Sequence, residues 1–200
     1  MSCVTKSTSL AFETIKAIDG RVQHIRFHQE RFDKTRKDLF NASHPLLLAS
    51  LLSPPKGVIC RVRVCYGKDI EKIEYIPYVS RKIQTFRLVE ASLQYDYKLC
   101  DREAINQLMN KESDDVIMVK EGVLKDASIA NIALQLDGTW YTPENPLLKG
   151  TVRQRLLESQ ALYAKHLTIE DIEKSEKFAI MNALIGFEII KNFQIIKGKH

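Results

Sequence analysis

Short runs of alternating apolar and polar residues recur along the chain, and this alternation predicts β-strands joined by tight turns. The first run spans residues 10–18. Asp19-Gly20 follows it, and this pair suits the positive φ angles of a two-residue hairpin turn, so residues 21–25 are expected to return as the partner strand. Further strands are predicted by the same pattern at 58–66, 70–79, 83–89, 115–120, 123–125, 129–136, 139–141, 178–181, 187–190 and 193–196. Glu121-Gly122 and Asp137-Gly138 are expected to turn two further hairpins.

Helical spacing of apolar residues interrupts these strands at a few places. It predicts helices at 28–40, 45–52, 101–110 and 152–163, and a short acidic helix within 167–173. The first 90 residues are expected to form hairpins with helices on one side, and the rest of the chain is expected to form a second, β-rich domain. We therefore predict a mixed α/β (α+β) fold in two small domains, residues 1–93 and 94–200.

Composition narrows the classes of function. Of the 200 residues, 44% are hydrophobic and 28% are charged, which is typical of a chain with an ordinary buried core. The net charge of +5 is spread along the chain, so we expect no nucleic-acid partner, although small anionic substrates would be attracted. No apolar run suggests a leader or a membrane span, so we expect no membrane partner and a cytoplasmic location. The four cysteines form no CxxC pair, so no metal site is expected.

Three weak signals carry the candidate chemistry. Lys98 ends an aromatic-rich extended segment, Asp126 lies between two predicted strands, and Gly150-Thr151 opens a predicted helix. Each has an ordinary interpretation: a solvated lysine, a turn residue and a helix cap. Together they match the needs of a pyridoxal 5′-phosphate (PLP) enzyme. Such an enzyme needs a lysine for the cofactor aldehyde, an acid for the pyridine nitrogen and a helix start for the phosphate.

The motifs around these residues resemble one family. They are Phe12-Glu13-Thr14-Ile15-Lys16, the segment 28–32 (HQERF), Lys98, the segment 122–131 (GVLKDASIAN) and the segment 148–153 (LKGTVR). In this order and spacing they resemble the class IV aminotransferase family of fold-type IV PLP enzymes. The resemblance implies a small-molecule substrate, a homodimer and a PLP-binding, barrel-like β domain in residues 94–200.

The resemblance also implies roles for individual residues. Lys98 falls on the Schiff-base lysine, and Arg31 on a ligand of the cofactor phosphate. Asp126 falls on the partner of the pyridine nitrogen, where the family usually has Glu. Leu148 would lie against the pyridine ring. Thr151 and Val152 would offer backbone N–H groups to the phosphate, and Val152 replaces a threonine that is often found there.

Within the family the chain looks most like the 4-amino-4-deoxychorismate lyases, which release pyruvate and form 4-aminobenzoate for folate synthesis. Thr14, Arg102 and the segment 181–184 (MNAL) carry this resemblance. Thr14 would help position the acid that assists departure of pyruvate. Arg61, with Arg63 as a second candidate, would bind the substrate carboxylates, although both could simply face solvent. The alternatives are an amino-acid aminotransferase of the branched-chain or D-amino acid type, and a catalytically weak relative.

Overall fold

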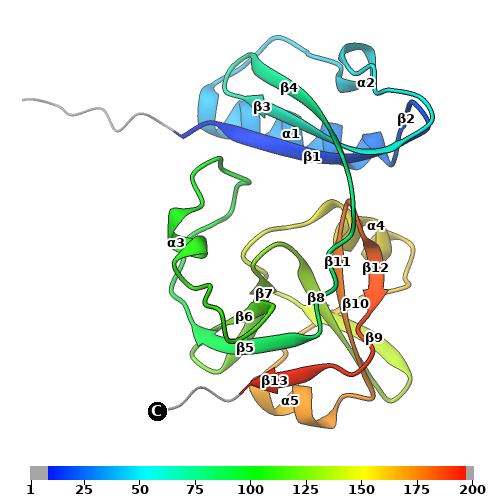
Figure 1. Ribbon diagram of the computed structural model, residues 1–200. Coiled ribbons are helices and arrows are strands. Elements are labelled where there is room, and N and C mark those ends of the chain that lie inside the picture. Colours follow the sequence, from blue (N-terminus) through cyan, green and yellow to red (C-terminus); the bar gives the residue numbers. More distant parts are fainter. Residues whose placement is uncertain (1–8, 197–200) are drawn as a thin grey trace, which may run out of the picture. The chain divides into compact units, whose positions relative to one another are not determined.

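A computed structural model describes residues 9–196 and confirms the mixed α/β fold (Figure 1). The chain forms two compact units. The first runs to Tyr78 and also includes Tyr97–Asp101, and the second comprises Val79–Asp96 and the chain from Arg102 onward. This grouping differs from the predicted boundary at residues 93/94 in two ways: residues 79–93 belong to the second unit, and Tyr97–Asp101, beyond that boundary, belong to the first. Within residues 9–196, no helix has the length and apolar character needed to cross a membrane.

The first unit contains a four-stranded antiparallel sheet in the order β2-β1-β3-β4. Its elements are β1 (Ala11–Ile18), β2 (Arg21–Val22), α1 (Ile25–Phe40), α2 (Leu48–Leu51), β3 (Ile59–Tyr66) and β4 (Ile70–Pro77). The sheet alternates as the sequence pattern predicts. Ala11, Ile15 and Val62 pack in one core with Phe32 of α1 and Leu48 of α2, so the two helices cover that face.

The opposite side of this sheet, the polar face, carries Phe12, Thr14, Lys16, Arg61 and Arg63. These residues alternate with the core residues along β1 and β3. The register brings several of them directly opposite one another, with Thr14 facing Arg63 and Lys16 facing Arg61. The two arginines therefore share one face, as their spacing in the sequence predicts.

The segment Tyr97–Asp101 lies along the first half of β1. The Phe12 N–H donates to the Lys98 carbonyl at 2.8 Å, and the Cys100 N–H donates to the Leu10 carbonyl at 2.7 Å. These two bonds place Lys98 beside β1. A pairing between residues about 90 positions apart leaves no local trace in the sequence pattern, and so the predicted boundary missed it.

The second unit is built on a nine-stranded sheet with the path β10-β9-β8-β7-β6-β5-β13, and β11 joins it by pairing with β8 and β12. Its strands are β5 (Thr85–Glu90), β6 (Asp115–Lys120), β7 (Val123–Ala127), β8 (Asn131–Leu136), β9 (Thr139–Pro143), β10 (Tyr163–Lys165), β11 (Lys177–Asn182), β12 (Gly186–Ile189) and β13 (Gln194–Ile196). Its helices are α3 (Glu103–Asn106), α4 (Thr151–Glu158) and α5 (Ile169–Lys174). Phe86, Phe178 and Phe193 form an aromatic centre in its core.

Hairpin chemistry agrees with the prediction at three turns. Asp19-Gly20, Glu121-Gly122 and Asp137-Gly138 each have positive φ at both residues, as a type I′ turn requires. Helix bounds agree less well. Helix α1 begins at Ile25, three residues earlier than predicted, after His24 adopts a left-handed conformation. Helix α4 ends at Glu158, because Gln160 has positive φ and residues 163–165 pair with β9 instead.

Candidate functional site

A buried carboxylate lies at the centre of the second unit's candidate residues. Asp126, near the end of β7, is only 4% exposed. Its Oδ1 accepts a hydrogen bond from Asn131 Nδ2 at 2.7 Å, and its Oδ2 accepts one from the Leu148 backbone N–H at 2.9 Å. Both oxygens thus accept from a neutral donor, and within residues 9–196 no charged side chain donates a hydrogen bond to them.

Asn131 extends this arrangement into a compact cluster. Its Nδ2 also donates to the Leu148 carbonyl at 2.8 Å, so one amide joins the first residue of β8 to both Asp126 and the loop before α4. Gly150 packs directly on the same side chain, and a Cβ at this position would overlap Asn131 Oδ1. We call Asp126, Asn131, Leu148 and Gly150 the carboxylate cluster. It fixes the strand motif against the start of the helix.

Burial controls the electrostatics of Asp126. Removal from water raises the pKa of Asp126 to about 6, against the opposing effects of the Leu148 N–H, Asn131 and the charge of Arg153. An ionised carboxylate has about four lone-pair positions, and the Asn131 amide and the Leu148 N–H occupy two of them, while the nearby Leu147 N–H also acts to lower the pKa. The side chain therefore suits one more donor, and a cationic N–H would offset the cost of its burial.

Helix α4 presents its N-terminus next to this cluster. Its N-cap, Gly150, makes no side-chain cap, and the first turn contains no acidic residue. Backbone N–H groups at such a start, with the positive end of the helix dipole, suit an anion. The Val152 side chain packs in a hydrophobic core with Ala133 and Leu162. Only the backbone N–H of Val152 could therefore donate to an anion.

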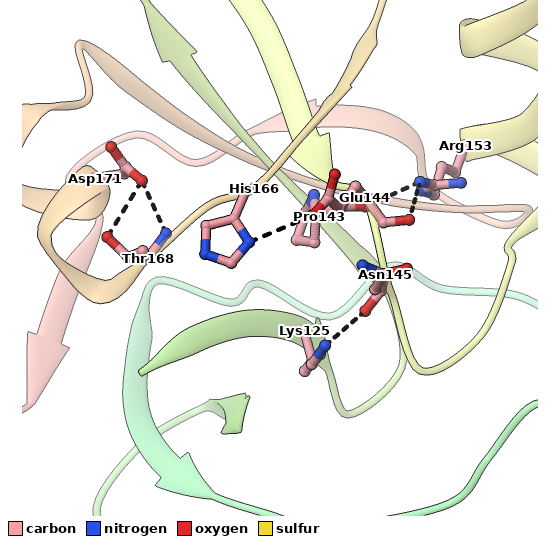
Figure 2. Close-up of polar contacts among 8 residues, drawn as sticks. All are labelled: Lys125, Pro143, Glu144, Asn145, Arg153, His166, Thr168 and Asp171. Carbon is pink, nitrogen blue, oxygen red and sulfur yellow. Dashed lines mark hydrogen bonds and ion pairs between the residues drawn. The ribbon is translucent and has the colours of Figure 1, made fainter. Parts of the chain in front are cut away.

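Three side chains fasten the loop that leads from β9 to this helix (Figure 2). Arg153, which is 6% exposed, donates from Nη2 to the Pro143 carbonyl at 2.9 Å and to the Glu144 carbonyl at 3.5 Å. Lys125 Nζ donates to the Asn145 carbonyl at 3.0 Å, and His166 Nδ1 lies 3.3 Å from Glu144 Oε1. Contacts from β7, α4 and the end of β10 thus hold residues 143–145 in place.

In the first unit, Arg31 forms a two-bonded ion pair with Glu13. Its Nε donates to Glu13 Oε1 at 2.8 Å, and its Nη2 donates to Oε2 at 2.6 Å. His28 Nδ1 lies 2.6 Å from the same Oε2. Burial acts to raise the pKa of Glu13, but the charge and hydrogen bonds of Arg31, together with His28, outweigh it and lower that pKa to about 2.

Lys98 lies over an aromatic ring on the polar face. Its Nζ is 4.6 Å from the centroid of Phe12, and the Arg63 guanidinium is 4.9 Å from the same centroid. Arg63 also lies 3.8 Å from Glu74 of β4. Thr14 is directly opposite Arg63 across the strands. The first unit therefore brings Thr14, Arg63 and Lys98 together on one face.

The sequence-predicted residues thus divide between the units: the first carries Thr14, Arg31, Arg61, Arg63 and Lys98, and the second carries Asp126, Leu148, Thr151 and Val152. Sequence reasoning gave no role to Glu13, Asn131 or Arg153. A signal for Glu13 existed, because it is an acidic residue at an apolar position of an alternating strand. Across residues 9–196, no group of three or more His, Cys, Asp or Glu side chains could hold a metal ion.

Comparison with known proteins decides the family. Residues 93–193, half of the chain, match the model of the amino-transferase class IV family. The chain belongs to this family. An uncharacterized protein of Haemophilus influenzae is 30% identical over 183 residues, covering 88% of this chain and 97% of its own length. These class IV aminotransferases are PLP-dependent enzymes, and the chain is accordingly an enzyme of a PLP-dependent family.

Solved structures agree with this assignment. A protein from Haemophilus somnus, described as a candidate 4-amino-4-deoxychorismate lyase, has a TM-score of 0.81 and 29% identity, covering 89% of this chain and 97% of its own. A hypothetical aminotransferase from Mycobacterium tuberculosis in its PLP-bound form has a TM-score of 0.76 and 16% identity, covering 94% of this chain and 82% of its own. The second likeness concerns the fold alone.

The pKa of Asp126 predicts a pH-dependent stability of the cofactor-free protein. The folded chain holds this proton up to about pH 6, whereas the ordinary value is 3.8. The contribution of Asp126 to stability is therefore full below the ordinary pKa and is lost as pH rises through 6. Asn at this position cannot ionise. Urea denaturation of wild type and Asp126→Asn should show the wild type losing about 2–3 kcal/mol relative to the variant between about pH 4 and pH 7. Parallel pH profiles would contradict the assignment.

Gly150 provides a steric prediction. Gly150→Ala forces Asn131 to move, and this movement breaks its bonds to Asp126 and Leu148. We expect a loss of about 1–3 kcal/mol in the free energy of unfolding. Gly150 has φ −71° and ψ 148°, which alanine adopts without strain, so the loss reports the contact with Asn131 and not the backbone. A Gly150→Ala protein as stable as wild type, by thermal denaturation, would show that the packing is not tight.

Proposed function

We propose that this chain binds PLP and that Lys98 is its point of attachment. The carboxylate cluster beside the start of α4 is the observation that carries the proposal. Asp126 is a buried carboxylate with acceptor capacity left over, which fits a protonated pyridine nitrogen. The uncapped N-terminus of α4, with Gly150 held against Asn131, fits a phosphate. Bound PLP would supply an electron sink for the substrate carbon.

The remaining residues would hold and orient the cofactor. Thr151 and Val152 would donate backbone N–H groups to the phosphate, and Arg31 would bind the same group. Leu148, whose N–H and carbonyl are both fixed by hydrogen bonds, would present its half-buried side chain to the ring. The fixed loop 143–145 leaves this backbone little freedom, which favours a preorganised site.

We propose further that the reaction is the release of pyruvate from 4-amino-4-deoxychorismate. The Lys98 amine would act as the general base that removes the ring proton next to the substrate amine. Thr14 would help deliver a proton to the departing pyruvate. Arg61 and Arg63, on the polar face that also carries Thr14, would bind the two carboxylates of the substrate. The similarity to the Haemophilus somnus protein supports this choice. Folate synthesis in the cytoplasm and a homodimer complete the proposal.

An aminotransferase is the second candidate function, favoured by the family match. It would use the same cofactor residues but would require a 2-oxoacid in every cycle. A catalytically weak enzyme is the third. It is motivated by Asp126, which is one methylene shorter than the usual glutamate.

PLP attachment is tested by colour. Wild-type protein incubated with PLP should retain visible absorbance after gel filtration, because Lys98 binds the cofactor covalently. Lys98→Ala should lose that absorbance. Lys16→Ala is the matched control, since Lys16 lies on the same polar face and is given no role. A wild-type protein without colour, or a Lys98→Ala variant with undiminished colour, would refute the attachment.

The reaction is tested without added 2-oxoacid. Substrate generated from chorismate and glutamine by an amination enzyme should yield 4-aminobenzoate and pyruvate in equal amounts, because a lyase regenerates its cofactor within each cycle. Product that appears only when a 2-oxoacid is supplied would identify an aminotransferase instead. PLP binding with neither activity would identify the catalytically weak relative.

A further inference from the structure

An acidic residue occupies a core position of the first unit's sheet. Along β1, Glu13 lies on the same face as Ala11 and Ile15, which pack in the hydrophobic core beneath α1. It is 0% exposed. A carboxylate in such a place is costly unless it is paired and fully hydrogen-bonded. We therefore asked which side chains pair with the Glu13 carboxylate and what this pairing fixes in place.

Two residues of α1 satisfy this carboxylate. Arg31 binds it through two parallel bonds, Nε to Oε1 at 2.8 Å and Nη2 to Oε2 at 2.6 Å. His28, three residues earlier on the helix, lies 2.6 Å from Oε2 through Nδ1. Because an ionised carboxylate only accepts, Nδ1 is the donor of this bond. The histidine holds the carboxylate while the carboxylate holds the arginine.

The two-bonded geometry fixes the plane and rotation of the guanidinium, which a single contact would not do. The Arg31 side chain is 15% exposed, whereas that of Glu13 is 0% exposed. Solvent therefore reaches the arginine on a side that Glu13 does not occupy. Any anion bound to Arg31 must use N–H groups other than the two taken by Glu13, namely those of Nη1 and the outer hydrogen of Nη2.

We propose that Glu13 is a positioning residue that orients Arg31 toward the phosphate of the cofactor, with His28 fixing the carboxylate. The inference rests on the proposed function, which makes Arg31 a phosphate ligand. It adds that the strength of phosphate binding depends on a residue that never contacts the phosphate. The low pKa of Glu13, about 2, keeps the carboxylate ionised across the working range of pH.

A comparison of PLP with pyridoxal, which lacks the phosphate, separates this role from a purely structural ion pair. If the Glu13–Arg31 pair were purely structural, its loss would weaken the binding of both ligands equally. If Glu13 positions Arg31, loss of the pair weakens the binding of PLP alone, because pyridoxal has no phosphate for Arg31 to bind. The dissociation constants of both ligands are measured by absorbance titration for wild type, Glu13→Gln and Glu13→Asp.

Glu13→Gln should weaken PLP by about tenfold or more and leave pyridoxal within about twofold of wild type. Glu13→Asp keeps the buried charge but withdraws it by one methylene. It should reduce the preference for PLP less severely, and it provides the test if Glu13→Gln does not fold. Glu30→Gln is the matched control, because Glu30 pairs with Arg26 on the surface of the same helix at 3.1 Å. That variant should bind PLP as wild type does.

Two results would overturn the inference: variants of Glu13 that bind PLP as tightly as wild type does, or variants that lose PLP and pyridoxal in equal measure. A double-mutant cycle tests whether Glu13 affects PLP binding through Arg31. In an Arg31→Met background, Glu13→Gln should cause no further loss of PLP affinity, and an additive loss would contradict action through Arg31. A wild-type protein that binds neither ligand would refute the proposed function itself, and this outcome is visible before any variant is compared.

Discussion

The bond between the Leu148 backbone N–H and the buried Asp126 carboxylate is the constraint on which the second unit's site depends. Apart from this bond, the loop that follows β9 is held by contacts of Arg153, Lys125 and His166 with residues 143–145. This bond, reinforced by the two bonds of Asn131, fixes the loop against β7 and β8 and sets where α4 begins. Because Gly150 packs on Asn131, helix start and carboxylate are one rigid arrangement.

Two buried acids show how partner charge decides the state of a carboxylate. Glu13 and Asp126 are both removed from water, yet the pKa of Glu13 is lowered to about 2 and that of Asp126 is raised to about 6. The difference lies in their donors. Glu13 is bound directly by the Arg31 guanidinium, whereas Asp126 has only neutral amide donors at hydrogen-bond distance. The charge of Glu13 is already balanced by Arg31, whereas Asp126 could still accept a hydrogen bond from a cationic group.

Much of the fold followed from local physics in the sequence. Alternation assigned the two faces of β1 and β3, and the Asp-Gly and Glu-Gly pairs marked hairpins that the structure confirms. Asp126 and Gly150 were recognised from their motifs. What the sequence concealed depends on docking between distant segments. The Glu13–Arg31 pair forms only when α1 packs on β1, and residues 97–101 join β1 through a long-range pairing. The early start of α1 depends on a left-handed His24 that no local rule predicts.

The proposed function depends on capture of PLP by Lys98, which lies beside β1. The most direct measurement is borohydride reduction of the protein after incubation with PLP, followed by digestion and mass spectrometry of the peptides. A PLP-derived mass increase is expected on the peptide containing Lys98 and on no other. A modification on a different lysine, or an unmodified chain, would contradict it.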